Sequence, residues 1–222
     1  MADAKRPRIK VTRNGPYLVS GGVPLTQQIV VSGAAGIPES WRTGQEYPTQ
    51  ENYALCRCGR SENQPFCDGE HMRGAFDGRE TASRRPYLER AETVKGPALT
   101  LKDDKELCVG AGFCDRAGGI RYLISRSDNP EAKKIAIEEC RNCPSGRLVV
   151  WDEVGKPLEP GYEPSAGIME DPQASISGPI TVRGSIPIES AEGTEYERRN
   201  RVTLCRCSRS ANKPFCDGSH MD

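Results

Sequence analysis

The stretch that organises the chain reads Cys56-Arg-Cys-Gly-Arg-Ser-Glu-Asn-Gln-Pro-Phe-Cys-Asp-Gly-Glu-His71, and it returns as Cys205-Arg-Cys-Ser-Arg-Ser-Ala-Asn-Lys-Pro-Phe-Cys-Asp-Gly-Ser-His220. The protein contains only two histidines, and each lies four residues after the third cysteine of one copy. Histidines scattered over a core or a surface would not fall in this way. The repeat therefore indicates a duplicated metal site with three cysteines and one histidine.

Within each copy we expect the ligands to converge in pairs. Side chains two residues apart in an extended segment point to the same side, so Cys56 and Cys58 can bind one metal. The Asp-Gly-x-His sequence suits the first turn of a helix, where Cys67 and His71 share a face and Asp68 accepts from free N–H groups. Two such pairs, each on its own iron, predict a 2Fe–2S site. The candidate ligands of both copies are Cys56, Cys58, Cys67, His71, Cys205, Cys207, Cys216 and His220.

A zinc ion and a disulfide framework are the alternatives to a cluster. Three cysteines and a histidine also form a zinc set, but zinc sites favour two or more residues between paired cysteines, whereas each pair here has one. Disulfides require an oxidising compartment, and the basic segment 1–10 lacks the apolar run of a secretion signal. We therefore expect a cytoplasmic protein in which clustered cysteines bind metal.

The similarity between the copies extends upstream of the cysteines. Gly15-Pro-Tyr-Leu-Val-Ser-Gly-Gly-Val-Pro-Leu25 matches Gly178-Pro-Ile-Thr-Val-Arg-Gly-Ser-Ile-Pro-Ile188. Alternating apolar residues around a glycine-containing turn predict a β-hairpin in both copies. The first copy has an additional segment, 34–50, which we interpret as a longer surface loop.

Composition limits the fold and the partners. Hydrophobic residues make up 36% of the 222 residues, and the chain has 17 prolines and 23 glycines. This composition favours an α+β fold that is rich in short strands and loops. Basic and acidic residues balance at 31 each, so charge gives no reason to expect nucleic acid as a partner. No apolar run is long enough for a membrane helix, so no membrane is expected either.

The middle of the chain carries a separate small unit. Asn129-Pro130 is a helix start signal, and the helix is expected to continue through Ile135 to Glu139. Arg147-Leu-Val-Val-Trp151 then reads as a strand. A proline-rich segment follows, which should be extended and poorly packed. The predicted division is 1–79 for the first Cys3His unit, 97–153 for the middle unit, 154–174 for the linker and 175–222 for the second Cys3His unit.

The two Cys3His motifs resemble the CDGSH iron–sulfur domain of the mitoNEET-like proteins. That family's pattern is C-x-C-x2-[ST]-x3-P-x-C-D-G-[SAT]-H, which the second copy fits throughout, whereas the first has Glu70 at the usual small position. The resemblance implies that each copy ligates one 2Fe–2S cluster through its four candidate ligands. Members are often homodimers with one cluster per subunit. A chain with two copies resembles such a dimer fused into an intramolecular pseudo-dimer, which we expect to be a monomer.

The middle unit resembles a divergent single-cluster ferredoxin. Cys108-Val-Gly-Ala-Gly-Phe-Cys114 reads as C-x2-A-x2-C, where a bacterial ferredoxin has C-x2-C-x2-C followed later by Cys-Pro, here Cys143-Pro144. Ala111 replaces the second ligand. Cys108, Cys114 and Cys143 thus suit a 3Fe–4S cluster, while Cys140 as a fourth ligand would retain 4Fe–4S. The alternatives are that Cys140 only packs as a small hydrophobe, or that the unit holds no cluster.

These sites leave three functions open. Clusters in one chain predict electron transfer with a redox partner, because histidine in place of thiolate raises the potential of a cluster. Histidine is also the weak ligand of such a site, which favours transfer of clusters to an apo-protein, or iron and redox homeostasis. A third possibility is a non-redox interaction module stapled by metal. An enzyme is not expected, since no histidine remains for acid–base work. Four arginines lie among the ligands: Arg57, Arg60, Arg206 and Arg209. The two interpretations are hydrogen bonds to the clusters and a solvent-facing patch for an acidic partner, and solvation is the default expectation.

Overall fold

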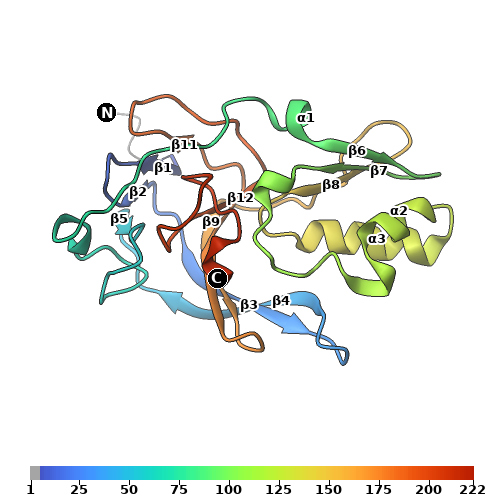
Figure 1. The fold of residues 1–222 in the computed structure, drawn as a ribbon, viewed down its shortest axis with the longest axis horizontal. Helices are drawn as coiled ribbons and strands as arrows, with labels where there is room; N and C mark the ends of the chain where they lie inside the picture. The colour runs from blue at the N-terminus through green and yellow to red at the C-terminus, as the bar shows by residue number, and fades with distance from the viewer. Residues whose placement is uncertain (1–5) are drawn as a thin grey trace.

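The computed structural model describes residues 6–222, and its strands form three sheets (Figure 1). Residues 1–5 of the basic segment 1–10 considered above lie outside the described residues. The four-stranded sheet contains β11 (Ile188–Glu189), β1 (Arg8–Val11), β2 (Tyr17–Ser20) and β5 (Asn52–Leu55), in that order. The five-stranded sheet contains β12 (Arg201–Leu204), β10 (Ile176–Arg183), β9 (Ser165–Asp171), β3 (Leu25–Ser32) and β4 (Pro38–Tyr47). The three-stranded sheet contains β6 (Glu92–Lys95), β7 (Thr100–Asp103) and β8 (Leu148–Trp151).

Helices are few and short. They are α1 (Tyr87–Arg90), α2 (Ile120–Ser125) and α3 (Pro130–Asn142), with 3-10 turns η1 (Glu70–Met72), η2 (Lys105–Leu107), η3 (Arg116–Gly118) and η4 (Ser219–Met221). The fold is therefore a strand-rich mixture of α and β structure, as the composition predicts. No helix within residues 6–222 is both long enough and apolar enough to cross a bilayer.

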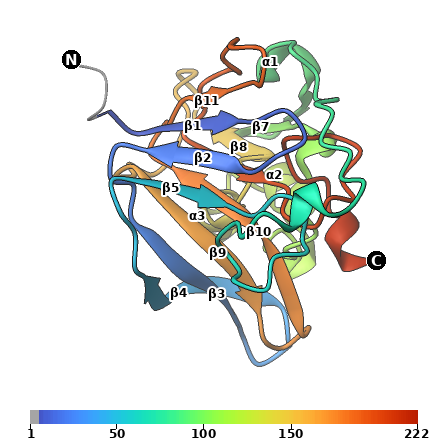
Figure 2. The ribbon, with the colours of Figure 1, turned by 90° about the vertical axis from the view of Figure 1, so that its left-hand side faces the viewer.

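Each of the two larger sheets contains strands from both copies of the repeat (Figure 2). Strand β11 of the second copy lies parallel to β1, with Ile188 opposite Ile9. Strand β3 of the first copy lies parallel to β9, with Leu25 opposite Ala166. The order β11-β1-β2-β5 in one sheet corresponds to the order β3-β9-β10-β12 in the other. Each strand of one copy thus takes the position that its equivalent from the other copy has in the second sheet. The copies therefore exchange one strand each in equivalent positions.

The prediction of a hairpin in each copy is wrong, and the exchange of strands between the copies explains why. Strand β2 is already paired on both edges, by β1 and by β5. The chain leaves it through Gly21 and Gly22, which have φ values of +85° and +65°, and β3 then joins the other sheet. In the second copy β10 and β11 are divided between the sheets in the same way. The segment 34–50 is also not a loop, because most of it forms β4, which pairs antiparallel with β3.

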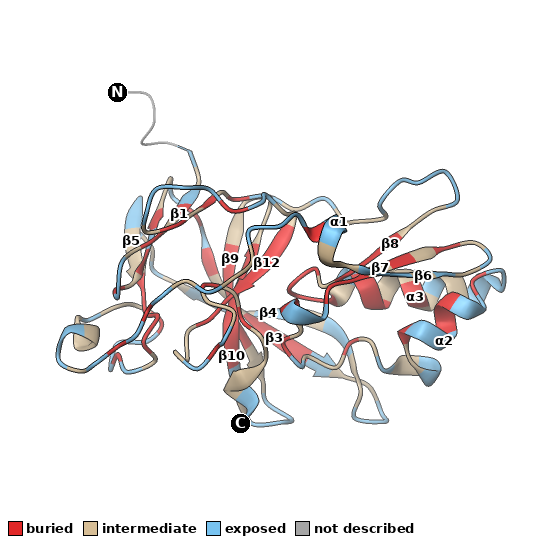
Figure 3. Ribbon diagram, turned by 45° about the horizontal axis from the view of Figure 1, so that its top comes forward, coloured by how far each residue is buried: buried red, intermediate tan, exposed pale blue. Residues whose placement is uncertain are grey.

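One hydrophobic core joins the two copies (Figure 3). It includes the fully buried Ile9 and Tyr17 of the first copy and Ile180 and Leu204 of the second. Strand β9 lies within the segment expected to be poorly packed, yet its Ile168 is 1% exposed and belongs to this core. That expectation is therefore wrong for 165–171, where the chain forms a central strand of the sheet.

The middle unit packs α2 and α3 against the three-stranded sheet (Figure 1). The side chain of Asn129 accepts hydrogen bonds from the N–H groups of Glu131 and Ala132, which caps α3 at the predicted start. Strand β8 confirms the expected strand and pairs antiparallel with β7. Leu101, Ile124, Ala136 and Val150 are among the buried residues between the helices and the sheet.

Candidate metal centres

The first two cysteines of each Cys3His motif lie side by side. The Sγ atoms of Cys56 and Cys58 are 3.8 Å apart, and those of Cys205 and Cys207 are also 3.8 Å apart. Two thiolates bound tetrahedrally at about 2.3 Å from one metal are about 3.8 Å apart. Each pair is therefore spaced to share one metal.

The third cysteine of each motif meets the histidine. The distance from Cys67 Sγ to His71 Nδ1 is 3.4 Å, and Cys216 and His220 repeat it at 3.4 Å. The histidines lie on the 3-10 turns η1 and η4 rather than on α-helices. Gly69 precedes η1 with a φ of +95°, a conformation that strongly favours glycine. This tight turn explains how a four-residue spacing brings sulfur and imidazole together.

The backbone between the two pairs is held by the strand that precedes it. In the first motif the N–H of Cys56 donates to the Pro65 carbonyl at 2.8 Å, and the N–H of Cys67 donates to the Ala54 carbonyl at 2.9 Å. The second motif has the matching bonds at 2.9 and 3.0 Å. Asp68 accepts from the N–H groups of Glu62 at 2.8 Å and Glu70 at 3.1 Å, as expected for this aspartate. The ligand loops are therefore rigid extensions of β5 and β12.

This donor set fits a two-iron cluster. Each motif presents one pair of thiols and one thiol–imidazole pair, which gives two protein ligands to each of two metals. Within residues 6–222, no three His, Cys, Asp or Glu side chains come together as they would around a single ion. A bound 2Fe–2S cluster would supply one-electron redox chemistry at these positions.

Burial shifts the pKa values of the candidate ligands, and these values determine which protons a metal must displace. It raises the pKa of the Cys58 and Cys67 thiols, and it raises the pKa of Cys216 to about 12. The neighbouring Cys205 hydrogen-bonds to Cys207 and lowers its pKa. Burial also lowers the pKa of His220, which favours the neutral imidazole that binds metal. Loading of the sites should release protons from the thiols.

The arginines among the ligands are not simply solvated. Arg57 is 2% exposed and donates to the carbonyls of Thr12 at 3.1 Å and Gly78 at 2.6 Å. Arg209 donates to the His220 carbonyl at 2.9 Å. The expectation of solvation is therefore wrong for Arg57, whose charge is buried because backbone carbonyls from distant segments surround it.

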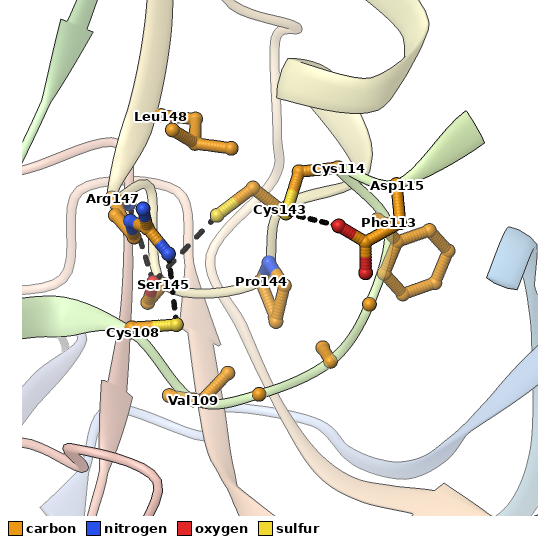
Figure 4. A pocket seen from close by; sticks show the side chains of 13 residues that line it. Cys108, Val109, Phe113, Cys114, Asp115, Cys143, Pro144, Ser145, Arg147 and Leu148 are labelled. Carbon is orange, nitrogen blue, oxygen red and sulfur yellow. Dashed lines mark hydrogen bonds between the residues drawn. The ribbon is translucent and has the colours of Figure 1, made fainter. Parts of the chain in front are cut away.

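The cysteines of the middle unit line a separate cavity of about 250 Å³ (Figure 4). Cys108, Cys114 and Cys143 all contribute to its wall, together with Ala111. The carboxylate of Asp115 also lines it, with Oδ1 3.7 Å from Cys114 Sγ. The structure thus brings together the three cysteines predicted for this site. They fit a cluster held by three thiolates.

Cys140 lies elsewhere. It is 1% exposed on α3, within the hydrophobic core of the middle unit, and it is not part of the cavity wall. Burial raises the pKa of its thiol well above the usual range. All ten cysteines are free of disulfides.

Sequence reasoning missed the environment of Cys108. Nη1 of Arg147 donates to Cys108 Sγ at 2.9 Å, while Nε and Nη2 of the same arginine donate to Asp103 at 2.6 and 3.0 Å. Asp103 is 1% exposed. No local sequence signal predicts this contact, because Arg147 lies four residues after Cys143 but contacts the sulfur of Cys108, which is 39 residues away.

Comparison with protein families agrees with this geometry. Residues 14–72 and 177–221 match the family described as iron-binding zinc finger, CDGSH type, and residues 94–153 match that described as divergent 4Fe-4S mono-cluster. The chain carries two CDGSH segments with a divergent 4Fe-4S mono-cluster domain between them. CDGSH domains bind 2Fe–2S clusters, and the family of the middle domain implies a 4Fe–4S cluster. No curated protein and no solved structure matches the chain.

The two CDGSH segments differ in one position of the ligand turn. Ser219 donates from its hydroxyl to Asp217 at 2.6 Å, which ties the second turn to its own loop. Glu70 instead forms an exposed ion pair with Arg73 at 2.5 Å. The negative charge that Glu70 places in this turn is therefore paired with a neighbouring cation.

Proposed function

We propose that the protein is an iron–sulfur electron carrier with three centres. The proposed ligands of the two 2Fe–2S centres are Cys56, Cys58, Cys67, His71, Cys205, Cys207, Cys216 and His220. The proposed ligands of the middle centre are Cys108, Cys114 and Cys143. The observation that carries this proposal is the presence of two CDGSH segments and a ferredoxin-type cysteine cavity in one chain.

The surroundings of the middle cavity support electron transfer over cluster storage. Arg147 donates to Cys108 Sγ and is itself fixed by the buried Asp103. Hydrogen bonds to cluster sulfurs are one of the means by which proteins set reduction potentials. A site that is tuned and partly enclosed in this way suits reversible electron transfer to a redox partner protein.

The exchanged strands support an internal pseudo-dimer. Each copy completes a sheet of the other, with equivalent parallel pairings at β1–β11 and β3–β9. We propose that the chain therefore needs no second copy and acts as a monomer. The equal numbers of basic and acidic residues give no support for nucleic acid or a membrane as partner.

Cluster transfer is the second candidate, and the first CDGSH segment favours it. A Cβ built on Gly69 would meet no atom within 4 Å, and Met72 is 82% exposed. The turn that carries His71 therefore borders open space. An acceptor protein could approach this ligand, whose protonation would loosen the cluster.

Redox titration and iron transfer, both measured on anaerobically purified protein, distinguish the two functions. A carrier should undergo repeated reversible one-electron titration with a constant iron content. A donor should lose iron to an added apo-ferredoxin at a rate that depends on acceptor concentration. Transfer without reversible reduction would refute the carrier proposal.

A further inference from the structure

The loop of the middle cavity touches the ligand turn of the second CDGSH segment. A Cβ built on Gly218 would lie 3.1 Å from the carbonyl oxygen of Cys108 and 3.8 Å from Val109 Cα. Gly218 lies between the candidate ligands Cys216 and His220. The backbone of one candidate ligand loop therefore lies directly against the backbone of another.

Met221 extends this contact. A Cβ built on Gly110 would lie 2.0 Å from Met221 Sδ, so the methionine side chain occupies the space beside this glycine. A second cavity, of about 230 Å³, is lined by Gly110 and Ala111 together with His220 and Met221. The loop 109–112 thus forms part of the wall of both cavities.

The first CDGSH segment lacks this neighbour. The position equivalent to Gly218 is Gly69, where an added Cβ would meet no atom within 4 Å. The position equivalent to Met221 is Met72, which is 82% exposed, whereas Met221 is 47% exposed. The repeat is therefore symmetric in its ligands and asymmetric in what surrounds them.

The second CDGSH loop also touches the first. A Cβ built on Gly59 would lie 3.1 Å from the Arg206 carbonyl oxygen and 3.3 Å from Cys207 Cα. The Arg206 guanidinium crosses the same boundary and donates to Gln64 Oε1 at 2.8 Å. The second CDGSH loop is thus in contact with both of the other candidate sites.

We propose that the second CDGSH site is the junction of an intramolecular relay, coupled to the middle site through Cys108–Gly110 and Gly218–Met221. The inference rests on the proposed carrier function. With clusters bound by Cys108, Cys114 and Cys143 and by the second CDGSH ligands, one electron supplied by dithionite would reduce the middle centre. That electron would then pass to one ferric iron of the second CDGSH site, which would reoxidise the middle centre. No bond forms or breaks. The first CDGSH site, whose His71 turn borders open space, is then the exit toward the partner.

A matched pair of surface variants tests the coupling without removing any ligand. Met221→Glu places a negative charge beside the loop 109–112, and Met72→Glu places the same charge at the equivalent position of the first segment. A negative charge stabilises the oxidised form of a nearby cluster, so Met221→Glu should lower the reduction potential of the middle centre. Met72→Glu should leave that potential unchanged. Equal effects of the two variants on the middle centre would overturn the inference.

Electron paramagnetic resonance supplies an independent readout. Cys67→Ala and Cys216→Ala each remove one terminal centre. In Cys67→Ala the second CDGSH centre remains, and its reduction should broaden the signal of the middle centre or speed its relaxation. In Cys216→Ala only the first CDGSH centre remains, and its reduction should have no such effect. The same behaviour in both variants would overturn the inference while leaving the carrier function intact. Wild-type protein without reducible centres would overturn both. If Cys216→Ala does not fold, the reduction potentials of Met221→Glu and Met72→Glu decide between the outcomes.

Discussion

Replacement of Arg147 by methionine tests how the middle site is built. The change removes two hydrogen bonds to the buried carboxylate of Asp103, at 2.6 and 3.0 Å, and the bond to Cys108 Sγ at 2.9 Å. Asp103 is then left with Arg121, at 3.3 Å, as its remaining ion-pair partner. Breaking a buried ion pair from one side costs about 3–5 kcal/mol. We expect a loss near 3 kcal/mol, about the lower limit, because Arg121 stays.

Arg121→Met is the matched control, because Arg121 also contacts Asp103 but is 46% exposed in its side chain. Exposed pairs contribute about 1 kcal/mol or less. Chemical denaturation followed by circular dichroism, at equal iron content, should therefore show a much larger loss for Arg147→Met. Its middle centre should also have a lower reduction potential, since a donor to the cluster sulfur is lost. Equal stability losses in the two variants, with no change of potential, would refute the assignment of Arg147.

Glu139, the two histidines and Ala111 provide three further tests. Burial raises the pKa of Glu139 to about 7, above its ordinary value of 4.5, so its ionisation opposes folding as pH rises between these values. Glu139→Gln should therefore gain up to about 3 kcal/mol of stability relative to wild type above pH 7 and nothing below pH 4.5, measured by denaturation across that range. His71→Cys and His220→Cys should each slow the acid-induced loss of visible absorbance below neutral pH and lower the potential of the altered centre; unchanged decay in both would show that histidine is not the weak ligand. Ala111→Cys should add a fourth thiolate to the middle site and remove any S = ½ signal of an oxidised 3Fe–4S centre; an unchanged spectrum and iron content would contradict a missing ligand at this corner.

The ligand pairs could be predicted from the sequence because local backbone geometry sets them. Cys56 and Cys58 are adjacent on one side of an extended segment, and Cys67 and His71 are joined by a single turn. The start of α3 could be predicted for the same reason, since the side chain of Asn129 caps the N–H groups of the residues that follow it. In each case the partners are separated by four residues or fewer.

Long-range partners could not be predicted. Alternating apolar residues in β2 and β3 are compatible with a hairpin, and nothing in the pattern says that β2 already has neighbours on both edges. Arg57 looks like a solvated cation in sequence, but its partners Thr12 and Gly78 come from distant segments. The contact between Gly110 and Met221 joins residues more than a hundred positions apart. Such contacts depend on the assembled fold.

Iron content and redox behaviour together show whether this chain holds iron–sulfur clusters. Iron should be quantified in anaerobically purified protein during a redox titration followed by visible absorbance and electron paramagnetic resonance. We predict about seven or eight iron atoms per chain, four from the two terminal centres and three or four from the middle centre, all reducible and reoxidisable. Zinc in place of iron, or iron that cannot be reduced, would contradict the assignment.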